Sequence, residues 1–194
     1  MPVHTPSCFS HHGTAPAHRG TVGEMSSTTR PLVSVEEYLA SVYQPDCDFV
    51  DGEVLERNRA EGDHAWIQAA IVAYFFVRRN EWGITVLPEM RVQVQPGRDR
   101  IPDVCVLLGQ QYEQILTQPP FLCIEILSPE DRWVRVEERI NDFLTMGVPY
   151  IWVIDPHTRQ AYISTPAEGL REVKDGVLRT ANPALLVPLS ELFA

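Results

Sequence analysis

IPDVCVLL at residues 101–108 and FLCIEIL at residues 121–127 are two short apolar segments that each contain a single acidic residue. Both are typical of short buried β-strands, with Asp103 near the start of the first and Glu125 inside the second. An ionised carboxylate in such a strand costs free energy unless it is paired, hydrogen-bonded or bound to a metal ion. Two of them, one on each strand, indicate a site that holds a divalent cation.

Length and composition fit one globular domain. The chain has 194 residues, of which 44% are hydrophobic and 22% charged, and its formal net charge is −10. No stretch approaches the roughly 20 apolar residues of a membrane-spanning helix. The negative charge disfavours a protein that coats nucleic acid, although an enzyme can bind nucleic acid through a local basic strip.

The first part of the chain differs in composition from the rest. Residues 1–30 are rich in Pro, Ser, Thr, His and Gly, and we expect a disordered tail there, followed by one folded domain over residues 31–194. Met25 is an alternative first residue, and a metal-binding histidine tract in the tail is a further alternative. The tail has no apolar segment typical of an export signal, so we expect a cytoplasmic protein with reduced thiols.

Sequence patterns predict alternating strands and helices. Ser34 and Glu37 have the spacing of a capping box, and Asp51-Gly52 is typical of a tight hairpin turn. The predicted helices lie at residues 34–42, 63–80 and 128–147, and the predicted strands at 48–50, 53–57, 84–87, 91–94, 101–108, 121–127, 149–154, 161–164 and 170–173. The strand–helix–strand order over residues 121–154 predicts a right-handed crossover in a mixed α/β sheet.

The last long helix is predicted to carry arginines beside its apolar stripe. Arg132, Arg135 and Arg139 fall on one flank at helical spacing, where they could form a phosphate-binding strip. The alternative for Arg132 and Arg135 is surface ion pairing with Glu138 and Asp142.

Three further stretches carry a family resemblance: RIPD at residues 100–103, CIEILSP at 123–129 and GVPYIWVIDP at 147–156. In this order, with a helix between the last two, they resemble the Uma-type family of restriction endonucleases, within the PD-(D/E)xK nuclease superfamily, over residues 32–190. The resemblance implies an α/β restriction-endonuclease-like core, in which helices flank a central mixed β-sheet. It also implies Mg²⁺, or Mn²⁺ in its place, hydrolysis of phosphodiester bonds in DNA, and a homodimer.

The resemblance assigns Glu53, Asp103 and Glu125 as metal ligands and catalytic residues. Hard Mg²⁺ prefers oxygen ligands, so carboxylates are a suitable set. Glu53 follows a tight turn and is otherwise a solvated hairpin acid, with Glu56 as a nearby competitor. His64, at the start of a helix, either orients a water or phosphate in the cleft as a catalytic residue or lies on the surface.

The chain also departs from the family pattern. The superfamily lysine, two residues after the second acid, is replaced by Leu127, and the only lysine in the chain is Lys174. Family members commonly carry a lysine on the following helix, and the matching position here is Arg139. Arginine binds phosphate bidentately but does not deprotonate water, so we expect Arg139 to stabilise charge.

Three hypotheses remain open from the sequence. The first is a metal-dependent DNA endonuclease, and the second is a catalytically weak or inactive relative that binds nucleic acid or a protein partner. The third is an enzyme that uses the same acid and metal site on small phosphodiesters.

Overall fold

A computed structural model describes residues 32–43, 46–56, 62–109 and 112–193. The expected disordered tail at residues 1–30, with its histidines, lies outside these residues. Within them, no helix is long and apolar enough to cross a membrane.

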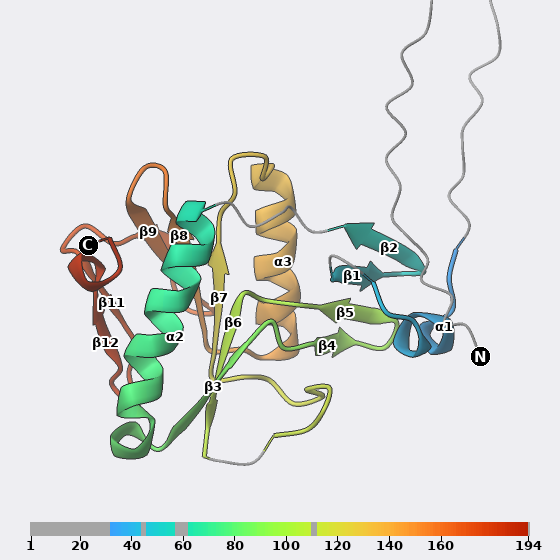
Figure 1. Cartoon of the computed structure of the whole chain (residues 1–194), viewed down its shortest axis with the longest axis horizontal. Coiled ribbons are helices and arrows are strands. Elements are labelled where there is room, and N and C mark those ends of the chain that lie inside the picture. Colours follow the sequence, from blue (N-terminus) through green and yellow to red (C-terminus); the bar gives the residue numbers. More distant parts are fainter. Residues whose placement is uncertain (1–31, 44–45, 57–61, 110–111, 194) are drawn as a thin grey trace, which may run out of the picture.

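A mixed six-stranded sheet forms the centre of the molecule (Figure 1). Its strands, in spatial order, are β10 (Gly169–Glu172), β9 (Gln160–Thr165), β8 (Tyr150–Asp155), β7 (Leu122–Ile126), β6 (Val104–Leu108) and β3 (Ile84–Pro88). β7 and β8 are parallel and are connected by helix α3 (Trp133–Met146), whereas the other neighbours are antiparallel. The predicted mixed α/β sheet is therefore confirmed.

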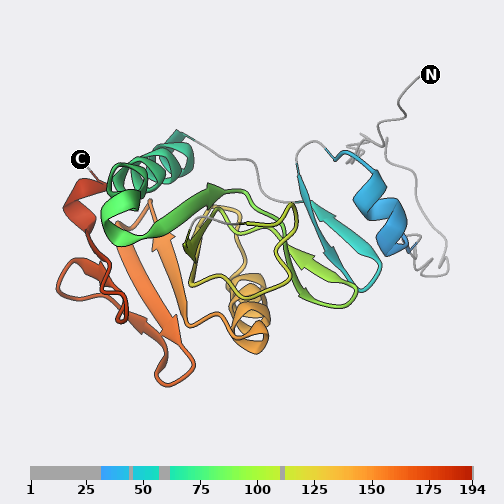
Figure 2. The same cartoon turned by 90° about the horizontal axis from the view of Figure 1, so that it is seen from below.

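Two helices cover the opposite faces of this sheet, as Figure 2 shows. Helix α2 (Gly62–Trp82) buries Ile67, Ile71 and Phe75 on one face, and α3 buries Val136, Ile140 and Phe143 on the other. Side chains alternate along a strand, so even-numbered residues of β6 and β7 face α2 and odd-numbered residues face α3. Glu125 belongs to the odd-numbered set of β7, and Asp103 immediately precedes β6.

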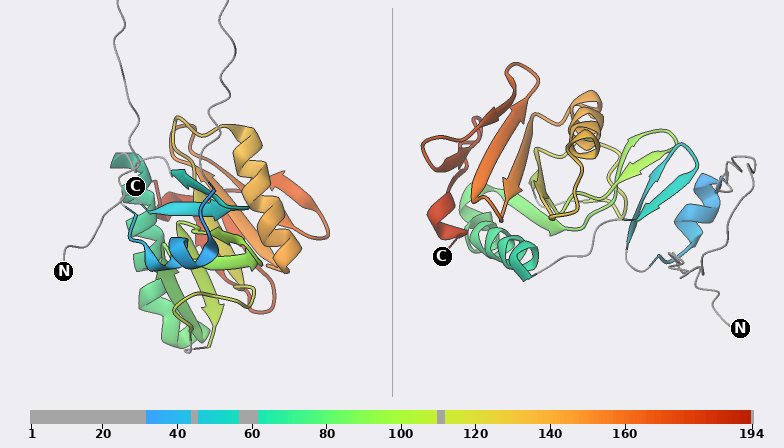
Figure 3. Two further views of the ribbon diagram at one scale, coloured as in Figure 1. Left: turned by 90° about the vertical axis from the view of Figure 1, so that its right-hand side faces the viewer. Right: turned by 90° about the horizontal axis from the view of Figure 1, so that it is seen from above.

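A smaller sheet extends from one side of the central one (Figure 3). Its strands, in spatial order, are β2 (Glu53–Glu56), β1 (Cys47–Val50), β5 (Arg98–Arg100) and β4 (Val92–Gln95), and helix α1 (Val35–Ala40) accompanies it. The Ser34 hydroxyl caps α1 by accepting from the Glu37 backbone N–H at 3.1 Å, as predicted. The hairpin turn at Asp51-Gly52 is also confirmed, with positive φ at both residues. We refer to this sheet and α1 as the wing.

The start of α3 was predicted wrongly. The sequence placed it at Ser128, but the helix begins at Trp133 and residues 128–131 form a separate turn. The Ser128 backbone N–H donates to Asp131 Oδ2 at 2.8 Å, and the Asp131 N–H donates back to the Ser128 carbonyl at 2.9 Å. The predicted end is correct, because Gly147 closes α3 in the left-handed conformation.

Three short strands were not predicted. They are β5, and the pair β11 (Val177–Arg179) and β12 (Leu186–Pro188), after which the chain forms a 3₁₀ turn at Leu189–Glu191. Strands of three residues are too short for an alternation of apolar and polar residues to identify them.

Asp99 is a buried acid inside the wing. Its side chain is fully buried, and neither carboxylate oxygen has a hydrogen-bond partner among the described residues. Burial, and to a smaller extent the nearby Asp48, raises the pKa of Asp99 above its ordinary value, although the cation of Arg91 opposes the shift. The folded wing therefore favours the protonated form of this acid.

We predict that Asp99→Asn stabilises the protein progressively as the pH rises. A raised pKa in the folded state means that the wild type loses stability from Asp99 as the pH rises through that pKa. Urea unfolding between about pH 4 and pH 8 should show equal stabilities at the acid end and a gain of about 1 kcal/mol for the variant at the neutral end. A gain that shrank as the pH rose would contradict this prediction.

Candidate active site

Asp103 and Glu125 lie on facing positions of two neighbouring strands. β6 and β7 pair with Cys105 opposite Cys123 and Val104 opposite Ile124. The same antiparallel register, continued by one residue, places Asp103 opposite Glu125. Both acids are only 2% exposed, and they contact opposite helices: Asp103 lies beside His64 of α2, and Glu125 beside Arg139 of α3. The two acids singled out in the sequence are thus brought together.

Asp103 is fixed by contacts from several elements. Its Oδ2 accepts from the Ile126 backbone N–H at 2.7 Å, and its backbone carbonyl accepts from Gln68 Nε2 on α2 at 3.0 Å. His64, in the first turn of α2, lies with Nε2 at 3.4 Å from Asp103 Oδ1. His64 is buried and lines the site, so the alternative of a surface residue is wrong. A catalytic role for His64 stays a prediction.

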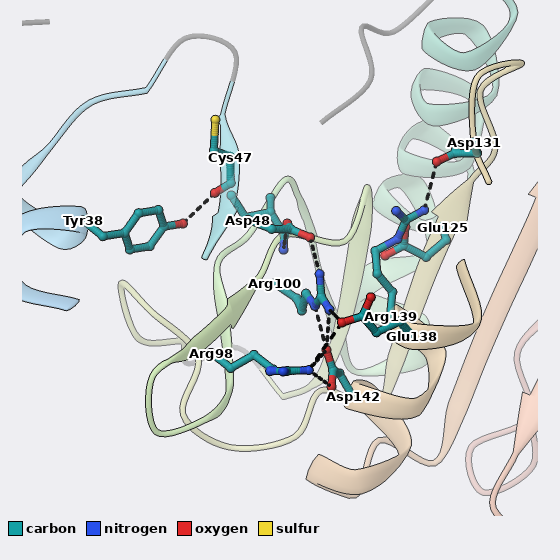
Figure 4. Close-up of polar contacts among 11 residues, drawn as sticks. Tyr38, Cys47, Asp48, Arg98, Arg100, Glu125, Asp131, Glu138, Arg139 and Asp142 are labelled. Atoms are coloured by element: carbon teal, nitrogen blue, oxygen red, sulfur yellow. Dashed lines mark hydrogen bonds and ion pairs between the residues drawn. The ribbon is translucent and has the colours of Figure 1, made fainter. Parts of the chain in front are cut away.

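Glu125 faces the guanidinium of Arg139 (Figure 4). Arg139 Nε lies 2.9 Å from Glu125 Oε2, and Nη2 lies 3.5 Å from Asp131 Oδ1. Burial alone lowers the pKa of Arg139, but Glu125 and then Asp131 outweigh it and hold the pKa above its ordinary value. The arginine predicted on the flank of the helix therefore reaches the acids as a permanent cation.

These side chains line one cavity of about 520 Å³. Its ionisable lining residues are Asp48, Glu53, Glu56, His64, Arg100, Asp103, Glu125, Glu130, Asp131, Arg132, Arg135, Glu138 and Arg139. Among the described lining residues, eight carboxylates against four guanidinium groups leave an excess of four negative charges when all are ionised. The cavity therefore attracts cations and repels free phosphate.

An ion-pair network that the sequence analysis missed joins the wing to α3 (Figure 4). Arg100 on β5 is 3% exposed and contacts Asp48 on β1 at 3.0 Å, and Asp142 and Glu138 on α3 at 2.7 and 3.3 Å. Arg98 also contacts Asp142, at 2.9 Å. The alternation Arg98-x-Arg100, which places both side chains on one strand face, was the available signal.

Arg132 and Arg135 do not pair with Glu138 and Asp142, which contact Arg98 and Arg100 instead. The surface-pairing alternative is therefore wrong within the described part of the chain. Both arginines are exposed and line the cavity. They remain suitable for binding an anion at its rim.

The described residues contain no group of three or more His, Cys, Asp or Glu side chains arranged closely enough to hold a metal ion. Glu53 lines the cavity from β2 with an exposed side chain, as does Glu56. The donor chemistry nevertheless fits a hard cation, because Asp103 and Glu125 present carboxylates on facing positions of an acidic cavity and Mg²⁺ usually retains several waters. The ligand set Glu53, Asp103 and Glu125 stays a prediction.

Comparison with known proteins identifies the class. The family model described as "Uma2: Putative restriction endonuclease" matches residues 35–191, and the chain belongs to this family. The crystal structure of a putative nuclease belonging to DUF820 from Anabaena variabilis matches with a TM-score of 0.72 at 21% identity, over 83% of this chain and 97% of that one. It confirms the restriction-endonuclease-like fold.

Two other comparisons give no information on the fold or function of this chain. The DrdV–DNA complex, solved by electron cryo-microscopy, matches with a TM-score of 0.38 at 18% identity, over 55% of this chain and 9% of that one. No curated protein matches the chain.

We predict that Arg100→Met destabilises the protein by about 3–5 kcal/mol, because Asp48 loses its buried counter-ion and Asp142 keeps only Arg98. The control is Arg171→Met, which removes the exposed pair with Glu168 and should cost less than about 1 kcal/mol. Urea denaturation of both variants measures the difference. Equally small losses would show that the network does not hold the wing to α3.

Proposed function

We propose that this protein is a Mg²⁺-dependent endonuclease, with Mn²⁺ as a substitute, that hydrolyses phosphodiester bonds in DNA. The observation that carries the proposal is the pair of buried carboxylates, Asp103 and Glu125, on facing positions of an open cavity. Membership of the restriction endonuclease family supports the same reaction class.

The charge of the cavity supports the dependence on a cation. The excess of four negative charges among the described lining residues repels a phosphodiester, and an added cation would offset it so that the substrate can approach the acids. Asp103 and Glu125 would hold that cation, with Glu53 as the third ligand. When bound, a divalent ion offsets charge on the phosphate and makes a coordinated water more acidic.

The remaining cavity residues take supporting roles in this proposal. Arg132 and Arg135 bind the DNA backbone at the rim, because they are exposed, cationic and form no ion pair with a described residue. His64 orients a water or phosphate beside Asp103. Arg139 stabilises negative charge but does not act as a base, because a guanidinium keeps its proton. Cleavage of both DNA strands needs two sites, so we also propose a homodimer.

A catalytically weak or inactive protein that binds nucleic acid or a protein partner is the second candidate. The observation in its favour is the pairing of Glu125 with Arg139, which engages one of the two acids. Leu127 in place of the superfamily lysine supports the same view.

We predict that the purified protein nicks supercoiled plasmid DNA with Mg²⁺ or Mn²⁺ and that Asp103→Asn and Glu125→Gln each lower the rate at least about 100-fold. A lost ligand removes several kcal/mol of charge stabilisation from the reaction. The control is Asp175→Asn, an exposed acid outside the cavity, which should cut at the wild-type rate. Gel electrophoresis measures nicking, and circular dichroism verifies folding.

Two results would overturn the nuclease proposal. DNA binding without cleavage, unchanged in the Asp103 and Glu125 variants, would support the second candidate. Cleavage of small phosphodiesters with no cleavage of DNA would indicate another substrate class for the same site.

A further inference from the structure

We propose that Arg139 is an internal counter-ion that takes the place of the divalent cation at Glu125, so that the guanidinium and the cation exclude each other there. This inference rests on the proposed metal site. It adds a regulatory property: the metal-free protein is held in a charge-paired form by its own arginine.

Arg139 and the proposed cation would both occupy the carboxylate of Glu125. Arg139 Nε lies 2.9 Å from Glu125 Oε2, and Glu125 is almost completely buried. A Mg²⁺ ligated by Glu125 would lie about 2.1 Å from a carboxylate oxygen, within a few ångströms of the guanidinium. Two cations at that separation in a largely buried site repel each other strongly. Binding of the divalent ion therefore requires Arg139 to move away.

Arg139 also lacks short, directed hydrogen bonds to the acids around it. Its Nε has no hydrogen-bond partner among the described residues, although it lies close to Glu125, so the N–H is not directed at the carboxylate oxygen. Its Nη2 contact with Asp131 is long, at 3.5 Å. Arg100 differs, because it makes directed hydrogen bonds of 2.7 Å to Asp142 and 3.0 Å to Asp48. Hydrogen bonds therefore fix Arg100 more firmly than Arg139, so a competing cation would displace Arg139 more easily.

A displaced Arg139 side chain would lie beside other arginines of the cavity. Arg139 lines the same cavity as Arg132 and Arg135, on the same flank of α3. A guanidinium released from Glu125 remains beside these two and adds to the positive rim. The cation would then prepare the site for a phosphate in two ways, by offsetting the acids and by freeing Arg139.

The test measures metal binding without DNA. Isothermal titration with MnCl₂ is performed on the full-length wild type, Arg139→Gln and Arg135→Gln. Both substitutions remove one positive charge from the cavity lining, but only Arg139 contacts Glu125. We expect Arg139→Gln to bind Mn²⁺ at least about tenfold more tightly than the wild type, because it no longer has to displace a competing cation. Arg135→Gln should change the affinity by less than about threefold.

Thermal unfolding gives a second readout. Without metal, Arg139→Gln removes the Arg139 guanidinium from Glu125, and the melting temperature of the variant should fall below that of the wild type. Saturating Mn²⁺ should raise the melting temperature of Arg139→Gln more than that of the wild type or of Arg135→Gln. A variant that folds only when Mn²⁺ is present would also support the inference.

The inference would be overturned if Mn²⁺ affinity rose equally in the two variants or in neither. It would also be overturned if Arg139→Gln stayed unfolded with Mn²⁺. Its failure is distinct from failure of the proposed function. If only Arg139→Gln bound Mn²⁺ more tightly and the wild type did not cleave DNA, Arg139 would be the counter-ion of a metal site that is not a nuclease site. If the wild type cleaved DNA but both variants gained Mn²⁺ affinity equally, the nuclease proposal would stand and the counter-ion role of Arg139 would be wrong.

Discussion

The burial of two carboxylates side by side in the central sheet is the constraint on which the site depends. β6 and β7 have strands on both sides and a helix on each face, so Asp103 and Glu125 are each only 2% exposed, at the cavity that they line. Each acid must be compensated by neighbouring groups. Asp103 obtains a backbone N–H from Ile126 and the imidazole of His64, and Glu125 obtains Arg139. The positions of α2 and α3 are therefore set by charge as well as by their apolar stripes.

The wing is oriented by a second set of charges. Its own core is small and consists mainly of aromatic side chains around Tyr38 and Phe49, below α1. Arg98 and Arg100 extend from β5 to the acids of α3. Buried ion pairs add little stability over apolar packing of the same volume, but breaking one is costly, so they favour one orientation over others. That orientation brings Asp48 and Glu53 to the cavity that Asp103 and Glu125 line.

The sequence predicted those parts of the fold and site that depend on local chemistry. The cap at Ser34, the turn at Asp51-Gly52 and the end of α3 at Gly147 each follow from one residue type at one position. Asp103 and Glu125 were identifiable because an acid inside an apolar strand is unusual. The ion-pair network was not, since its partners lie 42 to 52 residues apart and nothing local indicates that β5 faces α3. The start of α3 was misplaced because Ser128 and Asp131 bond to each other in a turn that imitates a helix cap.

The difference between arginine and lysine at position 139 connects these observations. A lysine amine can lose its proton when it is buried and then act as a base, whereas a guanidinium cannot. Here Glu125 and Asp131 raise the pKa of Arg139 even further, against the effect of burial, so residue 139 acts only through its charge and position. A permanent cation compensates Glu125 at any pH at which the protein is folded. Arginine thus removes one route for proton transfer and, by the same chemistry, lets a buried acid pair persist in a stable protein without a metal ion.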